Sequence, residues 1–155
     1  STRAKAELSR EAGAIEVLDY PDDPAEFGAK IRELTGGNGV AAVYDGVGAS
    51  TFEASLASLA VRGTLALFGA SRGPVPPFDL QRLNSAGSLF VTRPTLAHYA
   101  RNAQERRDLA GALFDRIASG AVTIPVGQTF ALADAGDAHR ALESRSTTGS
   151  TLLLP

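Results

Sequence analysis

The sequence predicts an α/β fold in which short parallel strands alternate with helices. Two apolar runs, Val40–Tyr44 and Thr64–Phe68, are continuously hydrophobic, as strands buried on both faces of a parallel sheet are. A helical segment separates the two runs, and this spacing is typical of right-handed βαβ units. Glycine-rich turns lie next to both runs and mark the strand ends.

The first part of the chain is expected to hold two helices and one strand. Ala4–Glu11 has a helical pattern that ends at Gly13, because glycine tolerates the left-handed conformation that follows many helices. Ile15–Leu18 is apolar and predicts a short buried strand. Pro24–Leu34 is the second helix, since Asp22-Asp23-Pro24 combines capping residues with a proline at the first turn.

The remaining elements follow in order. Ser50 or Thr51 is expected to cap a helix at Phe52–Leu59, and Arg62-Gly63 forms the turn into the second apolar run. After Gly69 the alternation becomes less regular. There the sequence predicts a short helix, a strand that ends before Pro94, two amphipathic helices and a last strand: Phe78–Asn84, Ser88–Thr92, Leu109–Ser119, Leu132–Arg145 and Thr151–Leu154.

Composition narrows the function class. Apolar residues make up 44% and charged residues 21% of the 155-residue chain, and its net charge of −2 is that of an ordinary globular domain. No basic surface suggests a nucleic-acid partner, and no basic or long apolar run suggests a membrane partner. The absence of cysteine excludes disulfides, thiol catalysis and cysteine zinc sites, which is consistent with a cytoplasmic location.

A dinucleotide-binding fold usually starts with a glycine-rich turn between a strand and a helix, where backbone N–H groups meet the pyrophosphate. Gly37-Asn38-Gly39-Val40-Ala41-Ala42 fits that motif literally, but it follows a helix and precedes a strand, so we interpret it as a helix-to-strand turn. The predicted fold is therefore a partial Rossmann-like parallel sheet with flanking helices that lacks the first βαβ part.

Two other loops lie where a ligand would bind, at the carboxyl ends of strands. Asp45-Gly46-Val47-Gly48 joins a strand to a helix, and it is either a lining of a cofactor cleft or a tight turn relieved by glycine. Phe68-Gly69-Ala70-Ser71 could let a ligand approach the backbone, although an ordinary loop is the simpler interpretation. The Asp45–Gly48 loop is not expected to hold the pyrophosphate.

The first residues bear on the choice of nucleotide. Ser1, Thr2, Arg3 and Lys5 offer hydroxyl groups and cations that suit a 2′-phosphate, which favours NADPH over NADH. On spacing alone, a solvated helix with scattered charges explains these residues better.

Together these segments are similar to a known family. The sequence resembles the zinc-independent NADPH:quinone oxidoreductases of the medium-chain dehydrogenase/reductase superfamily, over essentially all of its length. The most specific segment is Gly87–Leu96, and the other matching segments are Val43–Gly48, Phe52–Leu56, Arg62-Gly63, Phe68-Gly69, Ala133–Ala135, Ala138-His139, Leu142–Arg145 and Thr148–Ser150.

The resemblance implies a set of cofactor contacts and a dimer. It places Lys5, Tyr20 and Arg145 around the adenosine 2′-phosphate, and it places Gly46, Val47, Phe68, Ala70, Ser71, Val91, Thr92 and Arg93 beside the cofactor. Gly46 stands where the family commonly has a serine. Strand Ser88–Thr92 would pair with its twin in a homodimer. No catalytic residue and no metal ligand is assigned, and His139 is expected to be structural.

The activity that the resemblance implies is hydride transfer from NADPH to a quinone or an activated alkene. Residues 1–125 would be a partial NADPH-binding domain, and residues 126–155 a helix and strand that return to an absent substrate domain. We expect a fragment of a longer protein, inactive alone, rather than a split protein or a truncated gene product. The alternatives are a non-catalytic dimerising α/β module and the enoyl-reductase domain of a polyketide or fatty-acid synthase.

Overall fold

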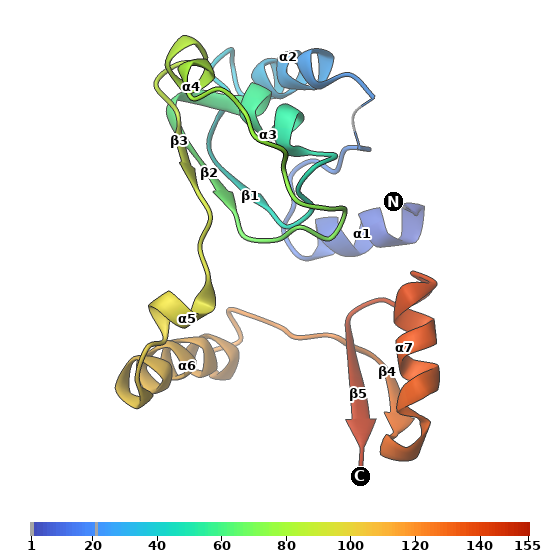
Figure 1. Cartoon of the computed structure of the whole chain (residues 1–155). Helices are drawn as coiled ribbons and strands as arrows, with labels where there is room; N and C mark the ends of the chain where they lie inside the picture. Colours follow the sequence, from blue (N-terminus) through green and yellow to red (C-terminus); the bar gives the residue numbers. More distant parts are fainter. Residues whose placement is uncertain (1, 21) are drawn as a thin grey trace. The chain divides into compact units, whose positions relative to one another are not determined.

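The computed structural model describes residues 2–20 and 22–155, and Figure 1 labels their elements. The chain forms two compact units. The first runs from Ser9 to Tyr99, and the second combines Thr2–Leu8 with Ala100–Pro155. The division into residues 1–125 and 126–155 that the sequence suggests remains a prediction.

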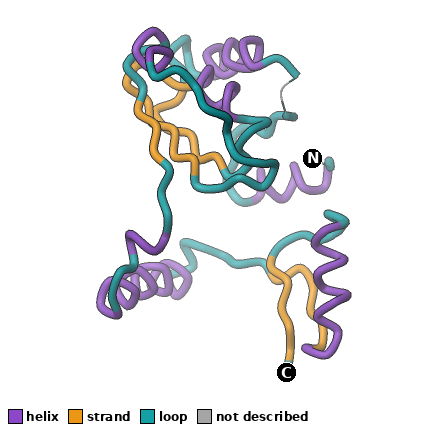
Figure 2. The backbone as a smooth tube through the Cα atoms, viewed as in Figure 1, coloured by secondary structure: helices purple, strands orange, loops and turns teal. Residues whose placement is uncertain are grey.

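A three-stranded parallel sheet is the centre of the first unit. Its strands β1 (Val40–Asp45), β2 (Leu59–Leu67) and β3 (Phe90–Thr92) lie in that order, so β2 is central. The register aligns Asp45 with Leu67, and this places the carboxyl ends of β1 and β2 side by side. Figure 2 shows the three strands running together. The fold class expected from the sequence is confirmed.

Helix α3 (Phe52–Ser58) connects β1 to β2 and packs on them, and α2 (Pro24–Leu34) packs against α3. The core between α3 and the sheet is apolar and largely leucine, and Phe78 packs on Phe52 edge to face with ring centroids 5.1 Å apart. Its buried members are Phe52, Leu56, Leu59, Leu65, Leu67 and Leu89. Aliphatic and aromatic burial of this kind is the main source of stability for the unit.

Two predicted helices have the expected boundaries for the expected reasons. The carboxylate of Asp23 accepts hydrogen bonds from the N–H groups of Ala25 and Glu26, which begins α2 at Pro24. Helix α1 (Arg3–Glu11) ends where the Gly13 N–H donates to the Arg10 carbonyl, with Gly13 at a φ of 101°. Both assignments from the sequence are confirmed, apart from a one-residue earlier start of α1.

The strand expected at Ile15–Leu18 is wrong. That segment has no regular structure, and the Ile15 side chain is 94% exposed. A strand needs a neighbour to satisfy its backbone N–H and C=O groups. In the part of the chain that the structure describes, no strand is hydrogen-bonded to this segment, and the outer edge of β1 has no partner strand.

The elements between Gly69 and Pro94 are shorter than expected. The helix expected at Phe78–Asn84 is α4 (Gln81–Ser85), because the Asp79 carboxylate accepts from the Gln81 N–H and forms a turn ahead of it. The strand expected at Ser88–Thr92 begins at Phe90, since Ser88 has a left-handed φ of 57°. A four-residue helix, α5 (Leu96–Tyr99), follows and was not expected.

In the second unit, α6 (Ala103–Ala118) begins six residues before the predicted start at Leu109. The Asn102 side chain caps it by accepting from the Glu105 N–H, but the charged residues that follow hide the helical pattern. Leu109 and Leu113 on its apolar face are each 48% exposed.

The last strand pairs with a strand that the sequence did not predict. Strand β5 (Ser150–Leu154) pairs in parallel with β4 (Val126–Ala131), and the polar residues of β4 conceal its strand character. The helix expected at Leu132–Arg145 is divided into a 3₁₀ turn at Leu132–Asp134 and α7 (Ala135–Glu143). Arg145 lies beyond α7 with a φ of 59°.

None of the helices in residues 2–20 and 22–155 is long and apolar enough to cross a membrane.

The contact between α2 and α3 depends on a glycine. A Cβ atom on Gly28 would lie 2.6 Å from the Ala57 carbonyl oxygen and 2.8 Å from its Cβ atom. We expect Gly28→Ala to lower the free energy of unfolding by about 1–3 kcal/mol, because the two helices must separate. Urea unfolding followed by circular dichroism measures this change.

Gly111 in α6 is the matched control, since nothing lies within 4 Å of a Cβ atom there. Gly111→Ala should leave the free energy of unfolding unchanged or raise it by up to about 1 kcal/mol, because alanine favours helix. Equal effects of the two substitutions on the free energy of unfolding would contradict the claim that the contact between α2 and α3 requires glycine at position 28.

Candidate functional site

The carboxyl edge of the first sheet carries two loops that are bonded to each other. One follows β1 at Gly46–Gly48, and the other follows β2 at Phe68–Gly73. Five backbone N–H groups donate across the pair: Phe68 and Gly69 to the Asp45 carbonyl at 2.9 and 3.2 Å, Ser71 to Gly46 at 3.3 Å, Arg72 to Val47 at 2.9 Å, and Ala49 to Gly73 at 3.1 Å. The two loops considered in the sequence therefore form one structure.

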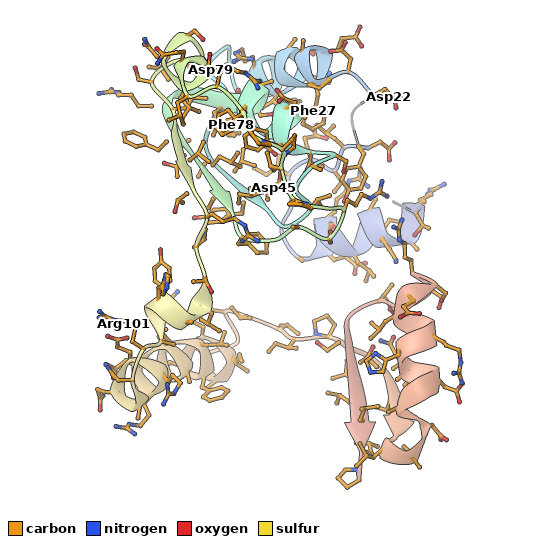
Figure 3. The ribbon with its side chains drawn as sticks, in the orientation of Figure 1. Asp22, Phe27, Asp45, Phe78, Asp79 and Arg101 are labelled. Carbon is orange, nitrogen blue, oxygen red and sulfur yellow. The ribbon has the colours of Figure 1, made fainter. Side chains whose placement is uncertain are left out.

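Asp45, at the end of β1, is the polar centre of this structure (Figure 3). It is only 4% exposed, and its carboxylate accepts hydrogen bonds from four neighbouring residues. The N–H groups of Val47 and Gly48 donate at 2.8 and 3.1 Å. The hydroxyl groups of Thr51 and Ser55 each donate at 2.8 Å to the second oxygen.

These contacts set the charge state of Asp45. Burial opposes ionisation, but hydrogen bonds from Gly48, Val47, Thr51 and Ser55 together outweigh it and hold the pKa of the carboxyl below its usual value. Asp45 is therefore a carboxylate at neutral pH. Thr51, expected as a helix cap, uses its hydroxyl on Asp45 and makes no side-chain cap bond.

Glycines let the two loops approach each other. A Cβ atom on Gly69 would overlap the Gly46 carbonyl, and one on Gly48 would lie 2.5 Å from the Gly73 carbonyl oxygen. A Cβ atom on Gly46 would lie 3.0 Å from the Phe68 ring. Glycine at position 46 thus gives the Phe68 ring its place against the first loop.

A cleft of about 450 Å³ lies beside the first loop. Tyr20, Gly46 and Val47 contribute to its lining, and most of the remaining wall is apolar. The Arg72 guanidinium lies over the Tyr20 ring, and its central carbon is 5.6 Å from the ring centroid. The full lining is Val17–Tyr20, Phe27, Ile31, Val40, Val43–Val47, Thr51, Ala54, Ser55 and Ser58.

A second hollow, of about 670 Å³, is lined by residues that follow β2 and β3: Phe68, Arg93, Pro94, Thr95, Leu96 and Tyr99. The Arg93 guanidinium donates to the Leu67 carbonyl at 3.0 Å, which fixes its side chain at the strand ends. Val91 and Thr92 pair with Leu65 and Ala66 of β2, so they lie in the same sheet.

The predicted site residues are divided between the two compact units. The first unit holds Tyr20, Gly46, Val47, Phe68, Ala70, Ser71, Val91, Thr92 and Arg93. The second holds Lys5 and Arg145, where the Lys5 ammonium donates to the Arg145 carbonyl at 2.8 Å. The pairing of Lys5 with Arg145 brings together residues 140 positions apart.

Sequence reasoning did not single out Asp45, Arg72 or Tyr99. The signal for Asp45 was present, because a carboxylate at a strand end with Thr51 and Ser55 on the next helix predicts a capping network. For Arg72 and Tyr99 the signal was weaker: a cation and an aromatic residue in loops rich in glycine and proline.

The parallel sheet, its α3 crossover and the glycine turns at its carboxyl edge define a Rossmann-like α/β protein. A family model described as zinc-binding dehydrogenase matches residues 12–153. The chain belongs to this family, and it corresponds to the carboxy-terminal portion of its quinone oxidoreductases.

Three relatives illustrate the similarity. A mycobacterial protein solved in complex with NADPH is 62% identical, with a TM-score of 0.95, over 100% of this chain and 47% of its own. A quinone oxidoreductase of Pseudomonas aeruginosa is 44% identical over 100% of this chain and 47% of its length. A 2-haloacrylate reductase of a Burkholderia species is 39% identical over 100% of this chain and 46% of its own length. The chain thus spans about half the length of these relatives.

The family description mentions zinc, but the residues of this chain do not fit a zinc site. The sequence has no cysteine, and no group of three or more His, Asp or Glu side chains in the described residues could hold a metal ion.

The Asp45 network gives a test of the site. Asp45→Asn should lower the free energy of unfolding at pH 7 by about 2 kcal/mol, because the amide nitrogen faces groups that donate to the carboxylate. A lowered pKa stabilises the fold above pH ~4, and this contribution disappears as the pH falls through the folded pKa. The difference between variant and parent should therefore shrink below pH ~4.

Urea unfolding at pH 7 and at acid pH measures both effects. Asp115→Asn, at an exposed position of α6, is the control and should change the free energy of unfolding by less than about 0.5 kcal/mol. A constant difference across the pH range would contradict the network.

Proposed function

We propose that this chain is the cofactor-binding part of an oxidoreductase that transfers hydride from NADPH to quinones or activated alkenes without zinc. The observation that carries the proposal is the pair of interlocked glycine loops at the carboxyl edge of the sheet, the edge where open α/β sheets bind nucleotides. Similarity over the whole chain to a protein solved with NADPH supports it.

The residues in the first unit suit a nucleotide. The cleft offers the apolar wall and few polar groups typical of cofactor sites, with bare backbone at Gly46. The hollow at Phe68 and Arg93 lies at the ends of the next strands, and we assign it to the nicotinamide end with Val91, Thr92, Ala70 and Ser71. When bound, NADPH supplies the hydride, and the protein supplies binding and orientation.

Lys5 and Arg145 are proposed as contacts of the 2′-phosphate, on the strength of the family resemblance. The Lys5 ammonium is within hydrogen-bonding distance of the Arg145 backbone, so the second unit holds two cationic residues together. Cationic donors of this kind bind phosphate oxygens strongly.

An activated alkene is the second candidate substrate. The observation that favours it is the similarity to the 2-haloacrylate reductase, whose substrate is an alkene activated by a carboxylate. Quinones and such alkenes share an electron-poor carbon that accepts hydride, so one cofactor site serves both reactions.

A homodimer through strand β3 is part of the proposal. In the described sheet β3 is an edge strand, and Phe90 on it is exposed. An uncovered edge presents backbone donors and acceptors to another strand. A cytoplasmic location, without a nucleic-acid or membrane partner, completes the proposal.

Titration with NADPH tests the function. The chain contains no G-x-G-x-x-G turn between a strand and a helix, so we expect NADPH to bind more weakly than micromolar and quinone reduction to be negligible. Calorimetry and a quinone reduction assay measure the two quantities. No binding at millimolar NADPH would contradict the cofactor assignment and leave the non-catalytic α/β module.

Lys5→Glu should reduce the preference for NADPH over NADH by about tenfold, because it replaces attraction to the 2′-phosphate by repulsion. The ratio of the two dissociation constants measures the preference. Lys30→Glu is the control, since Lys30 lies on α2 and pairs with Glu33 at 2.9 Å. An unchanged ratio in Lys5→Glu would remove Lys5 from the phosphate site.

A further inference from the structure

The hollow at the ends of β2 and β3 has one side to which the proposed function gives no role. It consists of Pro94 and Thr95, which lead out of β3, and of Leu96 and Tyr99 at the two ends of α5. We call these four residues the α5 side of the hollow, and Figure 1 shows α5 following β3. All residues that line the hollow belong to the first compact unit.

The local backbone determines where α5 begins. The Pro94 nitrogen has no hydrogen to donate, so the strand does not continue through it. The His98 N–H donates to the Thr95 carbonyl at 3.1 Å, which closes the first turn of α5. On the strand side of Pro94, the Arg93 guanidinium donates to the Leu67 carbonyl at 3.0 Å. The α5 side therefore starts from a fixed point at the end of the sheet.

The α5 side presents apolar and aromatic surface. The Leu96 and Tyr99 side chains are 74% and 60% exposed, and Phe68, which lines the same hollow, is 56% exposed. Arg93 is the one charged residue among the lining residues that the structure describes. A planar ring that covers these side chains removes apolar area from water, and aromatic side chains add a preference for stacked or edge-to-face contact.

The two acceptor classes of the proposed function differ in how well they suit this surface. A quinone is a flat, neutral ring, and its carbonyl oxygens can accept from the remaining Arg93 N–H groups. A haloacrylate is a small anion that would depend mainly on the Arg93 charge. Because Arg93 is exposed, an ion pair with it contributes little. The surface therefore favours the ring.

We propose that the α5 side binds the hydride acceptor, and that Tyr99 is a specificity-determining residue that favours a quinone ring over a small alkene carboxylate. This inference rests on the proposed function, because the acceptor must lie beside the nicotinamide, which we assign to the same hollow. The selection requires the ring of Tyr99 and not its hydroxyl group, so phenylalanine should replace tyrosine here.

Duroquinone and 2-chloroacrylate are the probes, one for each class of acceptor. The ring positions of duroquinone are methylated, which disfavours addition of lysine amines, and the chain has no cysteine to react with either probe. In amide chemical-shift titrations of the 155-residue chain, duroquinone should bind more tightly than 2-chloroacrylate and shift the amides of Leu96–Tyr99.

Tyr99→Ala should weaken duroquinone binding about tenfold and leave 2-chloroacrylate binding within about twofold. Tyr99→Phe should keep the duroquinone affinity within about twofold, because it keeps the ring. Phe114→Ala is the matched control, since Phe114 is an exposed aromatic residue on α6 in the other unit. It should leave both affinities unchanged, and circular dichroism should show the parent fold in every variant.

Full retention of the duroquinone affinity in Tyr99→Ala, or its loss in Tyr99→Phe, would overturn the role of the ring. An equal loss for both probes in Tyr99→Ala, or tighter binding of 2-chloroacrylate by the parent chain, would overturn the selection of quinones. Failure of both probes to bind a chain that binds NADPH would overturn this inference alone. Failure of NADPH itself to bind would overturn the proposed function.

Discussion

The buried carboxylate of Asp45 is the interaction on which the site depends. Asp45 is the last residue of β1 and precedes the glycine loop. Its carboxylate accepts hydrogen bonds from the loop and from Thr51 and Ser55 of the α3 region, so one side chain connects strand, loop and helix. A carboxylate this deeply buried is tolerated only when its oxygens are satisfied. The four donors meet that requirement, and in doing so they fix the direction in which the loop leaves the sheet.

The second loop depends on the first through backbone contacts that only small residues permit. The Asp45 carbonyl accepts from Phe68 and Gly69, and Gly69 itself lies against Gly46. The Phe68 ring then takes the space that a side chain at position 46 would need. Gly46, where the family commonly has a serine, is therefore matched to the position of Phe68. The cleft on one side and the hollow on the other have this pair of loops as their common boundary.

Sequence reasoning succeeded where the determinants are local. The Asp23-Pro24 signal and the apolar run of β1 define their elements without help from distant residues. The second apolar run locates β2, but the strand begins at Leu59, five residues before the predicted start at Thr64, and includes the Arg62-Gly63 turn. Sequence reasoning failed where pairing decides the outcome. Ile15–Leu18 has the composition of a strand but no neighbour that would make it one, and β4 has a polar composition but pairs with β5. Composition alone predicts neither the lack of a partner strand at Ile15–Leu18 nor the pairing of β4 with β5.

The features of the site also divide into those that the sequence predicts and those that depend on the packed structure. The loops at Gly46 and Phe68 could be placed at one sheet edge from the order of strands and helices, because parallel strands bring their carboxyl ends together. The stacking of Arg72 on Tyr20 and the use of Thr51 on Asp45 could not, since each joins side chains whose approach depends on the packed backbone. The charge of Lys5 suggested a phosphate contact, but family resemblance was needed to favour that role for Lys5 and to single out Arg145.

The central claim is that the interlocked loops form the cofactor site. The most direct measurement is an amide chemical-shift map of the chain during titration with NADPH. The account predicts that the largest shifts lie at Gly46–Gly48 and Phe68–Arg72, with α6 unaffected. Shifts confined to other parts of the chain, with these two loops unchanged at saturation, would contradict it.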